Sequence, residues 1–178
     1  PYINQLMLST YQELLSQLKK KVKELEKEIK KIIANYAPEE FLLLKSIPGI
    51  GDRVAAALVA MLNRFEPFDN AKEVCSFCGL SPSPYQSGET VKKKKGIVKK
   101  GNRYLRKLLY VAALSASRYN PDCKRLYQRL LSQGKPKKVA LVAVANKLLR
   151  QAFAVIKSGI PYDPYYLEKK MNLLPQSA

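Results

Sequence analysis

The feature that most constrains this chain is a heptad pattern near its start. Apolar residues recur there at alternating spacings of three and four, at Leu8, Tyr11, Leu15, Leu18, Val22, Leu25, Ile29 and Ile32. This is the a/d seam of a coiled coil, and it predicts one long helix over residues 3–35 that ends before Pro38. We expect a second copy of the chain to cover the seam in a homo-oligomer. The alternative is an intramolecular helical hairpin.

The charge balance limits the classes of function. Lys and Arg number 32 against 14 Asp and Glu, a formal charge of +18, which points to a polyanion such as DNA, RNA or an anionic membrane. Hydrophobic residues make up 47% of the chain, too many for a disordered protein. We find no apolar stretch near the roughly 20 residues that span a bilayer and no secretory signal. The basic run described below lacks the apolar face of a membrane-surface helix.

Cysteine and acidic residues give little support for a metal or redox site. Three Cys and no His argue against most zinc sites, a histidine base and a disulfide framework. Cys75-x-x-Cys78 falls in a short helix expected over residues 70–77, and we interpret it as two buried thiols rather than a redox pair. The acidic residues are scattered, without the carboxylate cluster of a metal-dependent nuclease. Catalysis by this chain would therefore rest on a nucleophile and on electrostatics.

Residues 39–63 have the pattern of a helix-hairpin-helix. Two short helices flank the turn Ile47-Pro48-Gly49-Ile50-Gly51. Glycines allow positive φ there, and they let the N–H groups of the second helix approach a phosphate. The candidate DNA contacts are Lys45, Gly49, Gly51 and Arg53. The alternative is a helix–helix corner that needs glycine for close packing.

Caps and apolar stripes mark the remaining helices. One helix begins after Asn102 and another after Asn120-Pro121, and a long apolar helix covers residues 136–157 before Ser158-Gly159. The predicted fold class is all-α, with five or six packed helices behind the coiled coil. We divide the chain into an oligomerisation helix (1–37), a helical domain (38–162) and a tail (163–178), with partial order expected from Ile160 onward.

The turn-rich segment 79–101 leads into the densest charge of the chain. From Val91 to Lys107 there are nine basic residues and no acidic one. These are Lys92, Lys93, Lys94, Lys95, Lys99, Lys100, Arg103, Arg106 and Lys107. Ser87 precedes them in a Gln-Ser-Gly turn, where cations could bind a scissile phosphate while the hydroxyl attacks it. On composition alone, an inert loop serine and a solvated lysine loop are the alternatives.

Several blocks of sequence carry a resemblance to a known family. The blocks are Ile47-Pro48-Gly49-Ile50-Gly51, Phe65 to Asp69, Phe77-x-Gly79-Leu80-x-Pro82, Tyr85-Gln86-Ser87-Gly88, Ile97-x-Lys99-x-Gly101-Asn102-Arg103-Tyr104-Leu105-Arg106-x-Leu108-Leu109, Ala112-Ala113 and Tyr162-Asp163. In order and spacing they resemble the C-terminal transposase domain of the insertion-sequence one-ten family of transposases. The resemblance covers about two thirds of the chain.

The resemblance implies a recombinase with a serine nucleophile. Ser87 would attack a DNA phosphodiester and become covalently joined to DNA, with Lys99, Arg103 and Arg106 as candidate contacts to phosphate or RNA. In this family the coiled coil links the domain to a separate acidic domain that binds Mg²⁺, and some members use a structured guide RNA. Residues 1–178 would then be a fragment that does not cut DNA alone, from a prokaryotic protein acting in the cytoplasm, at the nucleoid.

Two other functions fit the same residues. One is a non-enzymatic helix-hairpin-helix module that contacts DNA phosphates at Gly49, Gly51 and Arg53. The other is a protein that binds structured RNA through residues 92–107. Neither requires Ser87, so the chemistry at this serine separates both of them from the recombinase.

Overall fold

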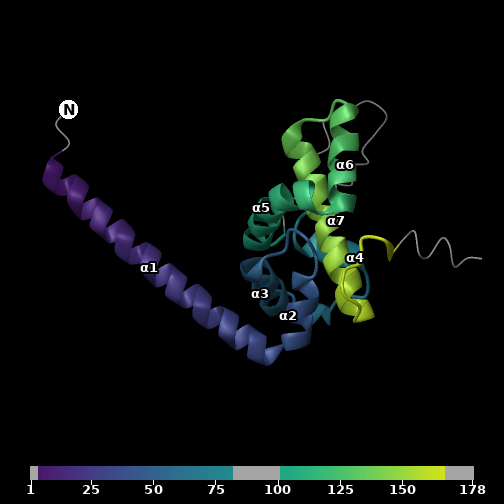
Figure 1. The fold of residues 1–178 in the computed structure, drawn as a ribbon, viewed down its shortest axis with the longest axis horizontal. Helices are drawn as coiled ribbons and strands as arrows, with labels where there is room; N and C mark the ends of the chain where they lie inside the picture. The colour runs from purple at the N-terminus through teal and green to yellow at the C-terminus, as the bar shows by residue number, and fades with distance from the viewer. Residues whose placement is uncertain (1–3, 82–100, 167–178) are drawn as a thin grey trace, which may run out of the picture.

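The computed structural model describes residues 4–81 and 101–166, and over these residues the fold is all-α. One long helix, α1 (Gln5–Tyr36), extends away from a body of six shorter helices (Figure 1). These are α2 (Pro38–Lys45), α3 (Asp52–Met61), α4 (Ala71–Phe77), α5 (Arg103–Tyr119), α6 (Pro121–Ser132) and α7 (Lys137–Ser158), with a 3₁₀ turn at Asn63–Phe65. The predicted fold class is confirmed.

Local signals in the sequence set most of the helix boundaries. Asn70, Asn102 and Asn120 accept hydrogen bonds from backbone N–H groups in the first turns of α4, α5 and α6, satisfying donors that a helix cannot pair internally. Pro38 separates α1 from α2, because it has no N–H with which to continue a helix. Gly159 ends α7 in the left-handed conformation, at φ 67°.

Helix α7 forms the centre of the body and packs against α2, α4, α5 and α6. Its buried residues are Ala140, Leu141, Val144, Ala145, Leu148, Leu149, Ala152 and Val155. By length and composition α7 could cross a membrane, and half of its most apolar window is buried inside the body. Such burial against neighbouring helices is what the core helix of a folded domain shows.

The apolar seam of α1 is open to solvent along its length. Its eight residues are 46–65% exposed, and Ile33 is the one buried residue of the helix. Near its end, α1 is fixed to α3 by ion pairs, with Glu26 Oε1 lying 3.1 Å from Arg53 Nη1 and Lys30 pairing with Asp52. The described chain therefore does not fold the seam into an intramolecular hairpin.

A left-handed turn follows α3. Asn63, Arg64 and Phe65 have φ values of 44°, 54° and 64°, a conformation that residues other than glycine seldom adopt. Phe65 is fully buried, and its ring meets that of Phe153 edge-on with the centroids 6.3 Å apart. Arg64 Nε lies 2.7 Å from Glu40 Oε1 on α2. We attribute the turn to this burial and this ion pair, which offset the local backbone strain.

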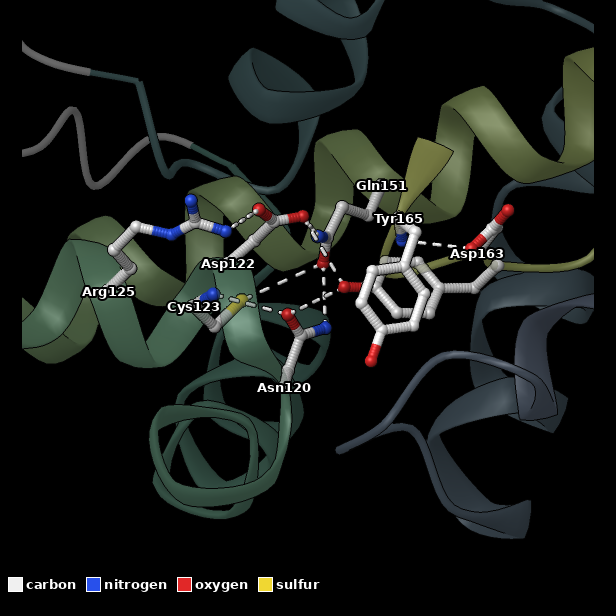
Figure 2. Close-up of polar contacts among 8 residues, drawn as sticks. Asn120, Asp122, Cys123, Arg125, Gln151, Asp163 and Tyr165 are labelled. Carbon is white, nitrogen blue, oxygen red and sulfur yellow. Dashed lines mark hydrogen bonds and ion pairs between the residues drawn. The ribbon is translucent and has the colours of Figure 1, made fainter. Parts of the chain in front are cut away.

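Asn120 is the one buried polar residue in the described part of the chain, and it joins three segments (Figure 2). Its Oδ1 accepts hydrogen bonds from the Cys123 N–H at 3.1 Å and the Tyr162 hydroxyl at 3.2 Å, while its Nδ2 donates to Gln151 Oε1 at 3.0 Å. Asp122 Oδ2 accepts from both Gln151 and Tyr162. The network fastens the segment after α7 to α6 and α7. Burial raises the pKa of Tyr162 to about 12, so its hydroxyl stays a donor.

We expect Asn120→Ala to lower the free energy of unfolding by about 2–4 kcal/mol, because it removes a helix cap and leaves buried partners unpaired. Asn70→Ala is the matched control, since it removes the cap of α4 at an exposed position and should cost about 1 kcal/mol. Chemical denaturation followed by circular dichroism measures both. Equal losses would show that the buried network adds nothing beyond the cap.

Candidate nucleic-acid interface

The predicted site residues in the described part of the chain form two groups. One group is the turn between α2 and α3, with Lys45, Gly49, Gly51 and Arg53, and the other is the start of α5, with Arg103 and Arg106. The remaining predicted residues lie outside the described residues: Ser87, Lys92, Lys93, Lys94, Lys95, Lys99 and Lys100. Gly49 packs against Ala116 near the end of α5, about 20 Å along the helix from Arg103. Arg53, by contrast, lines one cleft with Tyr104 of α5, so the structure brings one residue of the first group near the second group and places Gly49 away from it.

Gly49 serves a close contact between helices. It has a φ of +107°, and a Cβ at this position would lie 2.6 Å from the Ala116 Cβ, far closer than two carbon atoms approach. A Cβ added to Gly51 would meet no atom within 4 Å. The packing requirement at Gly49 is what the helix–helix corner interpretation predicts. Phosphate binding by this turn stays a prediction.

The two cations beside this turn have acidic partners within the chain. Lys45 Nζ lies 2.6 Å from Asp52 Oδ1, and Arg53 pairs with Glu26 of α1. Hydrogen bonds from Lys30 and then Lys45 hold the pKa of Asp52 below its usual value. The ionised Asp52 carboxylate sits in the first turn of α3, where it already complements the helix dipole. A phosphate binding there would have to displace or compete with it.

The second group lies where the segment that contains Ser87 joins the described part of the chain. We call this place the base of the segment; it consists of the end of α4 with Gly79 and Leu80, and of Gly101 and Asn102 before α5. Helix α4 ends in a Schellman motif: Gly79 N–H donates to Ser76 O at 2.8 Å and Leu80 N–H to Cys75 O at 2.8 Å. Gly101, just before α5, lies directly on this turn. A Cβ on Gly101 would be 2.2 Å from Gly79 N and 2.4 Å from Phe77 O. Only glycine fits this backbone-to-backbone contact, which places Gly101, directly after residues 82–100, against the end of α4, a few residues before them.

Polar contacts close this base. The Asn102 N–H donates to Phe77 O at 2.7 Å, and Arg106 Nη1 donates to both Cys78 O and Gly101 O at 3.4 Å. Arg106, predicted as a phosphate or RNA contact, therefore has a structural role at the base, and its contact with nucleic acid stays a prediction.

Helix α7 supplies a further partner that sequence reasoning missed. Asn146 Nδ2 donates to Leu80 O at 3.1 Å, and Arg150 Nε donates to Asn146 Oδ1 at 2.9 Å. An asparagine inside a long apolar helix, four residues before an arginine, is the signal that could have indicated it. The base thus draws on α4, α5 and α7.

The three cysteines of the chain are inert buried thiols. Cys75, Cys78 and Cys123 are fully buried and free. Burial raises the pKa of Cys78 and of Cys123 to about 12, and it also raises the pKa of Cys75. A protonated thiol is a poor nucleophile and a poor metal ligand. In the described residues the expected pair of buried thiols is confirmed.

Cations at the start of α5 face solvent. Arg103 and Lys107 are exposed and Arg106 is half-buried, and neither Arg103 nor Lys107 forms an ion pair with a described acid. Tyr104 between them is 46% exposed. Free cations with an exposed aromatic ring beside them are suited to a nucleic-acid backbone and its bases.

Comparisons with known proteins agree with this interpretation. Residues 42–128 match the sequence model of the Transposase IS116/IS110/IS902 family. A pilin gene-inverting protein of Moraxella lacunata is 35% identical over 123 residues, which are 68% of this chain and 38% of that protein. The transposase for insertion sequence element IS1111A of Coxiella burnetii is 30% identical over 150 residues, 83% of this chain and 40% of that protein.

The all-α body and these matches define a domain of the transposase class. Residues 42–128 of this chain form a domain of the IS116/IS110/IS902 transposase family. The chain spans well under two thirds of the length of these relatives. A 43.6 kDa protein of insertion element IS110 from Streptomyces coelicolor is 28% identical over 121 residues, which are 68% of this chain and 30% of that protein.

We expect Gly49→Ala to lower the free energy of unfolding by about 2–4 kcal/mol, because the new Cβ clashes with Ala116 and the left-handed backbone disfavours alanine. Gly51→Ala is the matched control, and its stability should change by less than about 1 kcal/mol because the position is open. Denaturation measures both variants. Weakened DNA binding by folded Gly51→Ala protein would support a phosphate contact at this turn.

Proposed function

We propose that this chain supplies the nucleophile of a DNA transposase, with Ser87 attacking a DNA phosphodiester. The observation that carries the proposal is the family match over residues 42–128, which includes Ser87 and the residues on both sides of segment 82–100. The contact of Gly101 with the end of α4 supports it, because it brings the two ends of the serine-bearing segment beside the free cations Arg103 and Lys107.

The chemistry is an exchange of phosphate esters. The Ser87 Oγ forms a bond to phosphorus, and one P–O bond to a deoxyribose breaks. The serine gives up its proton, and the departing deoxyribose oxygen takes up a proton to become a hydroxyl. One ester replaces another, so the step needs no oxidant or nucleotide, and the covalent joint is kept for the later strand joining. Basic side chains would stabilise the charge that develops on the phosphoryl oxygens.

The described residues do not fit a metal ion. No three His, Cys, Asp or Glu side chains in the described part of the chain gather in a way that could hold one. We place the Mg²⁺ implied by the family resemblance outside this chain, in a separate acidic domain, and derive no step through it here. On this proposal, residues 1–178 alone do not cleave DNA.

The proposed partners are DNA and a structured guide RNA, met in the prokaryotic cytoplasm. The net charge of +18 is the excess that remains after all 14 acidic residues are counted against the 32 basic ones. This excess favours extended contact with a polyanion. The alternative of a helix-hairpin-helix module is less well supported, because Lys45 and Arg53 are already paired.

We expect Ser87→Ala in the intact parent protein to abolish formation of a covalent protein–DNA adduct and strand exchange, while DNA binding changes by no more than a few-fold. The assay gives the protein labelled element-junction DNA with Mg²⁺ and any RNA that co-purifies, denatures it and maps the adduct by mass spectrometry. Ser83→Ala, four residues away, is the matched control and should keep the adduct. An adduct on another residue, or an unaffected Ser87→Ala protein, would remove Ser87 from the mechanism.

We further propose that α1 pairs with α1 of another copy through its exposed seam, and the 178-residue chain should therefore self-associate. Sedimentation at tens of micromolar should give a species larger than a monomer, and Leu18→Asp with Leu25→Asp should reduce it to a monomer by placing charge in the seam. Lys20→Asp with Lys23→Asp, outside the seam, is the control and should leave the assembly in place. A monomeric parent chain would contradict the coiled coil.

A further inference from the structure

The helices α6 and α7 carry a second concentration of positive charge, separate from residues 91–107. Residues 121–158 contain one acid, Asp122, and nine basic residues. The basic residues are Lys124, Arg125, Arg129, Lys135, Lys137, Lys138, Lys147, Arg150 and Lys157. Mixed signs of charge are what a surface needs for solubility alone. A segment with charge of almost one sign is instead suited to a polyanion.

Part of this charge converges in a concave site. A cleft of about 350 Å³ lies between α6 and α7 and is lined by Asp122, Arg125, Leu126, Arg129 and Lys147. Three cations thus share one hollow with a single carboxylate. Arg125 is exposed, with Nη2 3.4 Å from Asp122 Oδ1. Arg129 and Lys147 form no ion pair with any described acid.

The carboxylate in the cleft is already engaged. Asp122 Oδ2 accepts hydrogen bonds from Gln151 Nε2 at 3.2 Å and from the Tyr162 hydroxyl at 3.3 Å, and Figure 2 shows Asp122 between Gln151 and Arg125. One carboxylate against three cations leaves the cleft with a net positive charge. An anion entering the cleft would meet Arg129 and Lys147 without first breaking a pair.

The dimensions fit a phosphate backbone. Arg125 and Arg129 are four residues apart on α6 and so rise by about 6 Å. One strand of a duplex places a phosphate every 3.4 Å of axis, so the two arginines span about two phosphates.

We propose that the cleft formed by Arg125, Arg129 and Lys147 binds the phosphate backbone of a duplex nucleic acid, as a contact surface separate from the start of α5. The inference deepens the proposed function and rests on it, because it assumes that the chain works on nucleic acid. Lys147 follows Asn146, which holds the base of the Ser87 segment. A duplex bound in the cleft would therefore be fixed relative to that base through one rigid helix.

The test measures binding of the 178-residue chain to a labelled DNA duplex and to an RNA hairpin of equal length, across a series of salt concentrations. The variant is R125Q/R129Q/K147Q. The control is K20Q/K23Q/K31Q, which removes the same amount of charge from α1. These three lysines belong neither to the apolar seam nor to an ion pair of α1. A second variant, R129Q/K147Q, leaves the Arg125–Asp122 pair intact and guards against a loss of folding, which circular dichroism checks.

We expect the triple variant to bind more weakly and to lower the magnitude of the slope of log affinity against log salt concentration by about 2–3. The double variant should lower it by about 2. Both values follow from a slope of about 0.9 for each phosphate contact that is lost. The control should change the slope by less than 1. Weaker binding of the DNA duplex alone, or of the RNA hairpin alone, identifies which of the two nucleic acids the cleft binds. If the parent chain binds and both cleft variants change no more than the control, the cleft proposal is overturned while the proposed function stands. A parent chain that binds neither nucleic acid at low salt would overturn both.

Discussion

Burial of α7 in the centre of the body sets the position of the polar features that matter most. Its apolar face packs against four other helices, so its remaining faces are fixed in direction. Asn146 then reaches the carbonyl of Leu80 at the base of the Ser87 segment, Lys147 points into the cleft beside α6, and Gln151 joins the network around Asn120. Residues within little more than one helical turn thus serve three different parts of the molecule. Close packing tolerates little movement, which makes this arrangement rigid.

The positive charge of the chain divides into paired and unpaired cations. Lys30, Lys45, Arg53 and Arg64 neutralise acids on neighbouring helices and tie α1, α2 and α3 together. Exposed pairs of this kind contribute little stability, and their effect is mainly to orient α1. Arg103, Lys107, Arg129 and Lys147 lack such partners among the described acids. These cations of α5, α6 and α7 are therefore available to a polyanion, whereas Lys45 and Arg53 beside the α2–α3 turn are already paired.

Three glycines show how one residue type can have different uses. Gly49 and Gly51 stand in the same turn and look alike in the sequence, yet only Gly49 is pressed against another helix. Gly101 lies in a charged segment and has no turn pattern of its own, but it makes the tightest backbone contact of the glycines described here. Its contact with the end of α4 joins two segments that are more than twenty residues apart along the chain.

Sequence alone determined the helices, because their signals are local: the asparagine caps, Pro38, Gly159 and the apolar periods of α5 and α7 act within a few residues of one another. It also determined the family, because the order and spacing of the matching blocks can be read from the sequence without knowing which residues are in contact. It did not reveal the left-handed backbone at Asn63–Phe65, the partners of Lys45 and Arg53, the role of Asn146 or the basic cleft. Each of these depends on residues distant in the sequence that meet only after the helices pack, so tertiary structure decided which cations are free and which glycines are required.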